Sequence, residues 1–180
     1  MDITHIRVPQ WENYKGLLHG FMGRRGGKSG GPYSGLNVSY RVGDDLKTVS
    51  QNVCDLKLAV GIHDGRIVTM KQVHGDTIVE VKDKKLKDAG EADGMVTGEP
   101  DLYLGVLTAD CVPLLFVAPK QKLVAAVHAG WRGTLAGIGP RPCSYSSRNT
   151  ILKRMIWKWR SGHRSAFVAT KSKTTSPFHS

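Results

Sequence analysis

Three apolar segments in the second half of the chain constrain its fold more than any other feature. They span residues 102–108, 112–117 and 123–129, and only a few residues separate one from the next. Short runs rich in Val, Leu and Ala, bounded by turn residues, are typical of strands that are buried on both faces. We therefore predict adjacent buried strands here. Because Asp110 and Pro113 interrupt the region, it is not predicted to span a membrane.

The clearest helix signal lies at residues 44–59, where apolar residues recur at three- and four-residue steps. Asp44 or Asp45 can cap its first turn, since a carboxylate there accepts a hydrogen bond from a free backbone N–H. A second helix is expected to begin at Leu135, with Thr134 as its cap.

Further strands are predicted over residues 66–73 and 77–82, on either side of a short turn at residues 74–76. An early strand pair is predicted within residues 5–22, and residues 82–91 are expected to form a charged connector. Several strands with few helices favour an α+β domain that is built in layers.

The formal net charge of +11 is unevenly distributed along the 180 residues. Residues 1–138 contain 17 Lys and Arg and all 15 Asp and Glu, whereas residues 139–180 contain 9 Lys and Arg and no acidic residue. Strongly basic proteins often bind nucleic acids, but here the excess charge is confined to the final segment. We therefore expect a near-neutral domain of enzyme type, with neither nucleic acid nor membrane as a partner.

Cysteine is sparse, with Cys54, Cys111 and Cys143 widely spaced. An odd and low number of cysteines favours a reducing compartment, in which they are free thiols or metal ligands. The first residues contain no basic segment followed by an apolar run, so a signal peptide is not predicted. We expect the protein to be cytoplasmic.

Three side chains that can bind a metal are expected at strand ends: His74, Cys111 and His128. Zinc prefers thiolate and imidazole ligands, and catalytic zinc sites use three protein ligands with a fourth position open. The sequence spacing is not that of a zinc finger, so a buried free cysteine and two turn histidines remain the alternative from the residues alone.

Four motifs occur in order at residues 71–75 (KQVHG), 92–97 (ADGMVT), 108–113 (TADCVP) and 128–134 (HAGWRGT). Together they resemble the laccase-domain family, whose members were once called polyphenol oxidases and are now described as multifunctional purine nucleoside phosphorylases. The resemblance covers about residues 16–138.

The resemblance implies a zinc site at His74, Cys111 and His128, which would be both metal ligands and catalytic residues. It implies an α+β fold arranged as a four-layer α/β/β/α sandwich. The implied activity is phosphorolysis of adenosine, inosine, guanosine or methylthioadenosine, with adenosine deaminase as a side activity. The expected partners are therefore a purine nucleoside and phosphate; copper, suggested by the older family name, is the alternative metal.

Phosphorolysis requires phosphate to be held against the ribose. Arg25 and Lys28, in the glycine-rich basic loop at residues 23–35, and Arg132 are candidates for this substrate-binding role. A solvated loop is the alternative for residues 23–35. Trp131 is expected to pack in the core rather than to stack on a purine.

Two other enzyme classes remain open from the sequence. A metal-free cysteine hydrolase would use Cys111 as nucleophile and His128 or His74 as base. A copper polyphenol oxidase would need several copper centres and many histidines, whereas the chain contains 7 histidines.

The sequence after Gly139 does not resemble the family, which continues with segments such as Ala-Ile-Gly-Pro-Ser-Ile and Cys-Cys-Tyr-Glu-Val. Partly reconstructed codons explain the difference. Met155 must be ATG and Trp157 must be TGG, so reading one base earlier turns Met155–Ile156 into GAT (Asp) and Trp157–Lys158 into GAA (Glu). With permitted synonymous codons, residues 154–172 then encode both missing family segments.

We therefore predict two parts: residues 1–139, the N-terminal part of a single laccase-domain family domain, and residues 140–180, a non-native tail translated out of frame. The truncation is expected to impair the activity. A genuine basic tail that binds nucleic acid or a membrane is the alternative, although it would leave several large apolar side chains in water.

Overall fold

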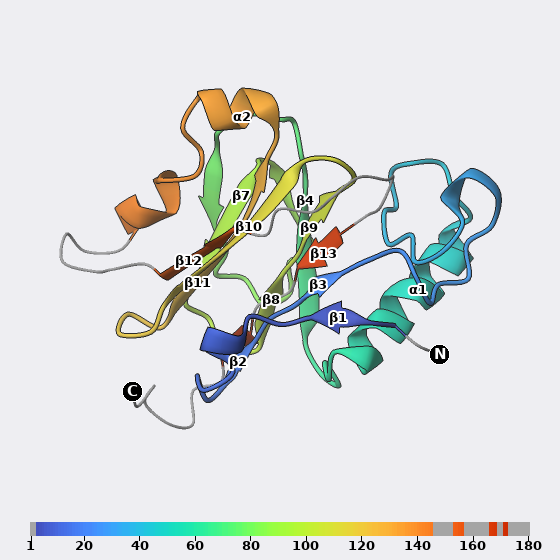
Figure 1. The fold of residues 1–180 in the computed structure, drawn as a ribbon, viewed down its shortest axis with the longest axis horizontal. Helices are drawn as coiled ribbons and strands as arrows, with labels where there is room; N and C mark the ends of the chain where they lie inside the picture. The colour runs from blue at the N-terminus through green and yellow to red at the C-terminus, as the bar shows by residue number, and fades with distance from the viewer. Residues whose placement is uncertain (1–2, 146–152, 157–165, 169–170, 173–180) are drawn as a thin grey trace.

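The computed structural model describes residues 3–145, 153–156, 166–168 and 171–172 (Figure 1). A five-stranded sheet crosses the domain in the order β12-β10-β11-β7-β5. Its strands are β5 (Ile78–Glu80), β7 (Gly94–Thr97), β10 (Val112–Ala118), β11 (Leu123–Ala129) and β12 (Lys153–Ile156). β10 and β11 form an antiparallel hairpin that pairs over its whole length, from Val112 opposite Ala129 to Ala118 opposite Leu123.

Both faces of this sheet are buried, as the apolar runs predict. In β10, Leu115 and Val117 face one hydrophobic cluster, whereas Leu114 and Phe116 face another. This alternation follows from the two-residue period of a strand. The hairpin is therefore apolar along nearly its entire length.

A three-stranded sheet packs against the inner face, in the order β6-β4-β8. Its strands are β6 (Asp88–Glu91), β4 (Arg66–Lys71) and β8 (Leu102–Leu104). A four-stranded sheet in the order β1-β3-β13-β9 contains β1 (His5–Ile6), β3 (Phe21–Met22), β9 (Val106–Thr108) and β13 (Ala166–Val168). A two-stranded sheet joins β2 (Leu17–Leu18) and β14 (Lys171–Ser172).

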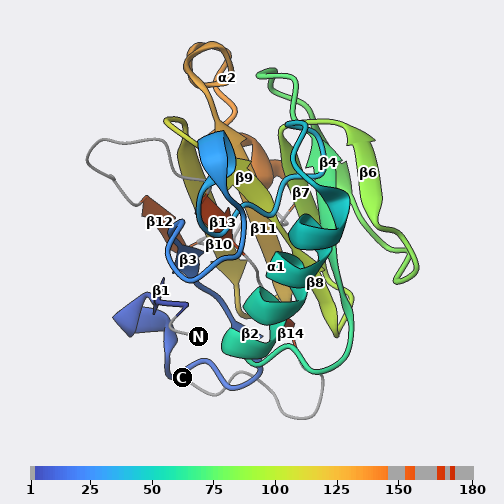
Figure 2. The same ribbon diagram turned by 90° about the vertical axis from the view of Figure 1, so that its right-hand side faces the viewer.

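Helix α1 (Leu46–Ala59) confirms the predicted helix, with Asp45 as its N-cap. The Asp45 side chain accepts a hydrogen bond from the backbone N–H of Thr48 at 2.8 Å. Leu56 of α1 packs with Tyr103 of β8, so the helix covers the outer side of the three-stranded sheet. Figure 2 shows α1 running in front of this sheet.

Helix α2 (Trp131–Leu135) and the 3₁₀ helix η3 (Arg141–Tyr145) contact β11 and β7, respectively. Between them, Ile138 packs on the outer face of the five-stranded sheet. The two other 3₁₀ helices are η1 (Pro9–Trp11) and η2 (Gly31–Tyr33). The order of layers is therefore helix, sheet, sheet and helical segment, which confirms the expected α+β class.

Three predictions of local structure are wrong. The segment 102–108 is two strands in different sheets, because the backbone changes partner at Gly105. The connector 82–91 contains β6, an edge strand that pairs with β4 through the main chain despite its polar side chains. α2 begins at Trp131 after the extended N-cap Gly130, rather than at Leu135.

The strands predicted over 66–73 and 77–82 are confirmed as β4 and β5, and the early strand pair as β1 and β3. Among the described residues, no helix is long and apolar enough to cross a lipid bilayer.

Asn52 of α1 forms hydrogen bonds with the glycine-rich loop at residues 23–35 and with Asn37. Its fully buried side chain accepts a hydrogen bond from the backbone N–H of Lys28 at 2.8 Å and donates to Ser29 Oγ at 2.9 Å and the Asn37 carbonyl at 2.8 Å. Because these groups lie away from water, the side chain cannot be removed without leaving polar atoms unsatisfied.

We expect Asn52→Ala to lower the free energy of unfolding by about 1–3 kcal/mol, the cost of leaving a buried polar group unpaired. Urea titration followed by circular dichroism measures this change. The matched control is Gln51→Ala, which removes only an exposed hydrogen bond to Asp55. Equal stability losses in the two variants would contradict the role of Asn52.

Candidate metal centre

Three ligand-type side chains from separate segments meet at one end of the five-stranded sheet. His74 lies in the turn after β4, Cys111 directly precedes β10, and His128 is in β11. Antiparallel pairing puts Val112 opposite Ala129, so Cys111 and His128 fall at the same end of the hairpin. One donor atom from each of the three residues lies within 4.8 Å of the others. The rings of His74 and His128 are perpendicular, with centroids 4.7 Å apart.

Asp93 connects two of these three residues. Its fully buried carboxylate accepts hydrogen bonds from the backbone N–H groups of Val73, His74 and Gly75 at 3.3, 2.9 and 2.7 Å. It also lies 2.8 Å from Nδ1 of His128. With Nδ1–H donating to the carboxylate, Nε2 of His128 keeps a lone pair for a metal ion.

The turn at His74 depends on these contacts. His74 has a φ of 61°, in the left-handed region that non-glycine residues seldom adopt. Consecutive N–H groups converging on one carboxylate offset the cost of this conformation. Asp93 therefore positions the backbone of one candidate ligand and the ring of another.

Gly130 leaves the space in which the three side chains meet. A Cβ atom there would lie 2.8 Å from Cδ2 of His74, 3.5 Å from Sγ of Cys111 and 3.5 Å from Cε1 of His128. The Gly130 position is also the N-cap of α2, so the start of this helix adjoins the cluster.

The electrostatic environment acts differently on Cys111 and His128. Burial lowers the pKa of His128, although the hydrogen bond to Asp93 opposes this shift, so the imidazole is neutral near pH 7. Burial and the nearby carboxylates of Asp110 and Asp93 raise the pKa of Cys111. Without a metal the thiol is therefore protonated at neutral pH, and a bound cation would have to displace this proton.

The donor set fits a borderline metal such as zinc. Tetrahedral coordination with ligand bonds of about 2.0–2.3 Å places two donors of one zinc ion roughly 3.3–3.7 Å apart. The three candidate donor atoms lie within 4.8 Å of one another, so the side chains would have to move closer together to hold one ion. Two imidazoles and one thiolate also leave a fourth tetrahedral position open.

The three residues expected to bind phosphate are not gathered at this cluster. Arg132 lies in α2 and is exposed, with its guanidinium 5.1 Å from the ring centroid of Trp131. Lys28 forms an ion pair with Asp55 at 3.2 Å, and Arg25 is exposed in the same loop. Figure 1 shows α2 at the top of the molecule and this loop at its right-hand side, beside α1.

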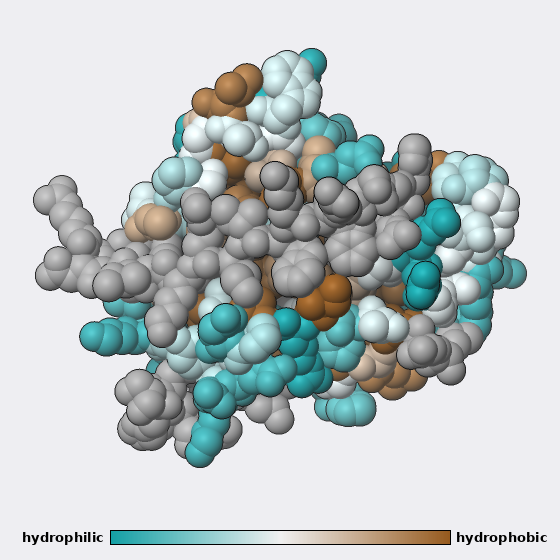
Figure 3. All heavy atoms as spheres, in the orientation of Figure 1, coloured by the Kyte–Doolittle hydropathy of each residue, from teal (hydrophilic) through white to brown (hydrophobic). Residues whose placement is uncertain are grey.

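The expectation that Trp131 packs in the core is wrong. Trp131 and Leu135 are 67% and 80% exposed, because α2 contacts the protein through Gly133 instead. A Cβ atom on Gly133 would meet the Gly75 carbonyl oxygen at 2.4 Å. Figure 3 shows hydrophobic surface at the top of the molecule, over α2.

Sequence reasoning did not assign a role to Asp93, although its motif was recognised. The residue lies in the segment 92–97, between the small residues Ala92 and Gly94. These small neighbours were the signal that the sequence offered, and the structure shows that both are buried. Close packing around a carboxylate indicates that its partners are in the protein rather than in water.

Comparison with known proteins identifies the family. A family model described as multi-copper polyphenol oxidoreductase laccase matches residues 18–157. The chain therefore belongs to the laccase-domain family.

Among its curated relatives is a purine nucleoside phosphorylase of Deinococcus radiodurans, 41% identical over 123 residues, which are 68% of this chain and 47% of the relative. Purine nucleoside phosphorylase YlmD of Geobacillus stearothermophilus is 34% identical over 155 residues, covering 82% of this chain and 52% of the relative. The chain thus spans about half the length of the curated relatives it matches.

Solved structures agree with the fold. The crystal structure of YlmD from Geobacillus stearothermophilus matches with a TM-score of 0.75 and 30% identity, covering 87% of this chain and 65% of that one. The hypothetical protein YfiH of Bacillus licheniformis matches with a TM-score of 0.75 and 28% identity, covering 82% and 57%.

We expect Asp93→Asn to weaken the binding of added Zn²⁺ by about 10- to 100-fold, the usual effect of losing a partner that orients a ligand. The amide nitrogen of Asn cannot accept a hydrogen bond, so it would face one of the donors that now converge on the carboxylate. Titration against a competing chelator measures the affinity.

Cys111→Ala is the positive control for lost binding, because it leaves two ligands. Asp64→Asn, at an exposed position, is the matched control for the change of charge. Circular dichroism establishes that each variant is folded. An unchanged zinc affinity in folded Asp93→Asn would contradict the orienting role.

Proposed function

We propose that this chain is part of a zinc-dependent purine nucleoside phosphorylase that acts on adenosine, inosine, guanosine or methylthioadenosine. Adenosine deamination is proposed as a side activity. The convergence of His74, Cys111 and His128 is the observation that carries the proposal. Relatives named purine nucleoside phosphorylase, at 34–41% identity, support a purine nucleoside and phosphate as the substrates.

In the proposed reaction, a phosphate oxygen forms a bond to C1′ of the ribose while the bond from C1′ to the purine breaks. The leaving purine takes the bonding electrons and acquires a proton. His74, Cys111 and His128 would hold the metal, which supplies a Lewis acid when bound. Nδ1 of His128 faces the Asp93 carboxylate, so Nε2 of His128 points away from that carboxylate. Asp110 is proposed to orient a ligand or transfer a proton.

Arg25, Lys28 and Arg132 are proposed to bind phosphate. Arg132 has the more direct support, because it lies two residues after Gly130, whose position touches all three candidate ligands. Its guanidinium is exposed and positively charged. Arg25 and Lys28 belong to a loop apart from α2, so their contribution has to be tested separately.

The two alternative enzyme classes have less support. A metal-free cysteine nucleophile needs a lowered thiol pKa, whereas burial and adjacent carboxylates raise the pKa of Cys111. A polyphenol oxidase with several copper centres needs several ligand clusters, and the described part of the chain contains one group of three such residues.

The tail after residue 139 is proposed to result from a one-base change of reading frame near the codons of Gly139 and Pro140. The forced Asp and Glu codons at residues 155–158 support this proposal. Segments of this tail form β12 and β14, which are edge strands, and β13, which pairs with β3 on one side and with β9 on the other. In each case the pairing uses main-chain groups and does not require particular side chains.

Restoring one base at these codons is expected to open a frame that encodes Ala-Ile-Gly-Pro-Ser-Ile and Cys-Cys-Tyr-Glu-Val. Sequencing of the coding DNA across codons 138–141 is the measurement. An early stop codon in the neighbouring frame would overturn the proposal.

We expect the frame-repaired protein to convert inosine and phosphate into hypoxanthine and ribose 1-phosphate, and the 180-residue chain to show little turnover. A catalytic site must be held to within about 0.5 Å by the surrounding structure, and the tail does not supply the native surroundings. Separation of the purine from the nucleoside by chromatography measures the rate. The proposal requires that Cys111→Ala abolish this activity. An active variant would show that the cluster of His74, Cys111 and His128 is not the catalytic site.

The same assay separates the candidate phosphate ligands. Arg132→Ala should raise the KM for phosphate by about 10- to 150-fold, which corresponds to the 1.5–3 kcal/mol of a charge-assisted hydrogen bond. Arg25→Ala tests the glycine-rich loop in the same way. If neither variant changes the phosphate dependence while both bind zinc normally, the phosphate site lies elsewhere.

A further inference from the structure

A cavity lies away from the metal cluster, between α1 and the three-stranded sheet. Its volume is about 610 Å³, within the range of small-molecule pockets. None of its lining residues is a candidate metal ligand. The residues come from the loop before α1, from α1 itself, and from β4 and the start of β6: Val38, Tyr40, Arg41, Ser50, Val53, Leu56, Lys57, Arg66, Ile67, Thr69, Lys87 and Asp88.

The inner part of this pocket is apolar. Val38 and Leu56 are almost completely buried, whereas Val53 and Ile67 are half-buried and border the open space. Tyr40 also lines the pocket and is 52% exposed. Apolar surface of this kind favours the burial of a flat organic group.

The rim of the pocket is strongly basic. Arg41, Lys57, Arg66 and Lys87 line it together with a single carboxylate, that of Asp88. Asp88 is already paired with Arg41, so positive charge remains in excess. Among the described residues, neither Lys57 nor Lys87 forms an ion pair.

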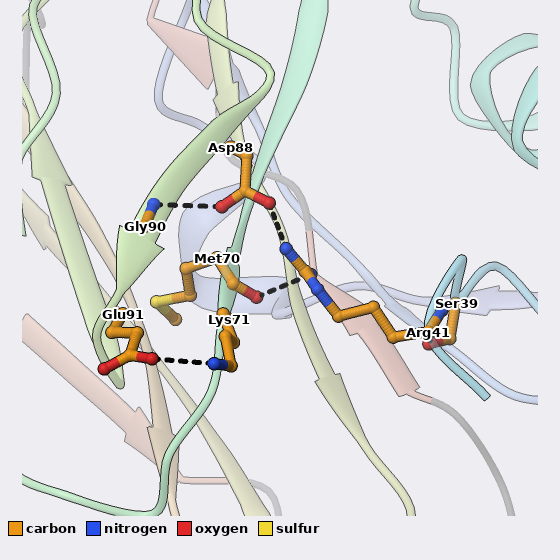
Figure 4. A network of polar contacts seen from close by, with 7 residues as sticks. All are labelled: Ser39, Arg41, Met70, Lys71, Asp88, Gly90 and Glu91. Carbon is orange, nitrogen blue, oxygen red and sulfur yellow. Dashed lines mark hydrogen bonds and ion pairs between the residues drawn. The ribbon is translucent and has the colours of Figure 1, made fainter.

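Arg41 stabilises one side of the pocket. Its side chain leaves the loop before α1, donates a hydrogen bond to the Met70 carbonyl at 3.2 Å and pairs with Asp88 (Figure 4). The other oxygen of Asp88 accepts a hydrogen bond from the backbone N–H of Gly90 at 2.9 Å. These contacts join the loop before α1, β4 and β6, so this side of the pocket is held in place by the protein itself.

We propose that this pocket binds a phosphate monoester whose organic part is a flat, largely apolar ring. A phosphate monoester carries about −1.5 to −2 charges at pH 7. This charge matches the unpaired cations of the rim better than the single charge of a carboxylate ligand would. The ring is placed against Val53 and Ile67, and the phosphate lies between Lys57 and Lys87. This inference is independent of the reaction proposed for the metal cluster.

The test uses 1-naphthyl phosphate as the probe and isothermal titration calorimetry of the 180-residue chain. We expect saturable binding of one molecule per chain. The double variant Lys57→Gln/Lys87→Gln should bind at least 10-fold more weakly. Because Lys87 is exposed and Lys57 is half-buried outside the hydrophobic clusters, circular dichroism should show an unchanged fold.

The matched control is Lys47→Gln, which removes an exposed positive charge from α1 outside the pocket. It should bind the probe as the unaltered chain does, and so should Cys111→Ala, which disrupts the metal cluster. 1-Naphthol and inorganic phosphate, each lacking half of the probe, should bind at least 10-fold more weakly than 1-naphthyl phosphate.

The proposal is overturned by any of four results. These are no saturable binding of the probe, equal binding by the double variant and the unaltered chain, loss of binding in Cys111→Ala, and inorganic phosphate binding as tightly as the probe. The third result would place the probe at the metal cluster, and the fourth would indicate a simple anion site.

Discussion

The carboxylate of Asp93 is the interaction on which the candidate metal centre depends. It is fully buried, and it is shared by three consecutive backbone N–H groups and the ring of His128. A buried carboxylate without such partners would be strongly unfavourable. Here the hydrogen bonds that stabilise the Asp93 carboxylate also fix the turn at His74 and the tautomer of His128. The same interactions therefore stabilise the fold and position the candidate ligands.

The β10–β11 hairpin supplies the rigid frame around this interaction. Its side chains pack on both faces of the five-stranded sheet, so a shift of register would move each side chain to the opposite face. The register therefore has little freedom, and Cys111 and His128 are held at the same end of the hairpin. Asp93 joins this frame through its own carbonyl, which accepts the His128 backbone N–H at 2.7 Å.

The candidate metal cluster and the pocket beside α1 differ in the charge of the groups around them. The metal cluster is enclosed by acidic groups and glycines, whereas the pocket beside α1 carries four basic residues and one acid. The cluster lies at one end of the five-stranded sheet, whereas the pocket lies between α1 and the three-stranded sheet. Asn52 joins the glycine-rich loop to α1, and Arg41 joins the segment before α1 to β4.

The sequence by itself determined the α+β class, α1 with an aspartate cap, and the buried hairpin, because local periodicity and capping need no distant partner. The structure decided that Asp45 rather than Asp44 is this cap. It also identified His74, Cys111 and His128, through motifs separated by long stretches of chain. Only the tertiary structure decided that these side chains converge, that Asp93 joins them and that Trp131 is exposed. These outcomes depend on strand register and layer packing, since Gly133 rather than Trp131 meets the neighbouring turn. The division of segment 102–108 into two strands and the pairing of polar β6 with β4 have the same reason. Both depend on which distant strand pairs with the main chain, and a local sequence pattern does not encode this.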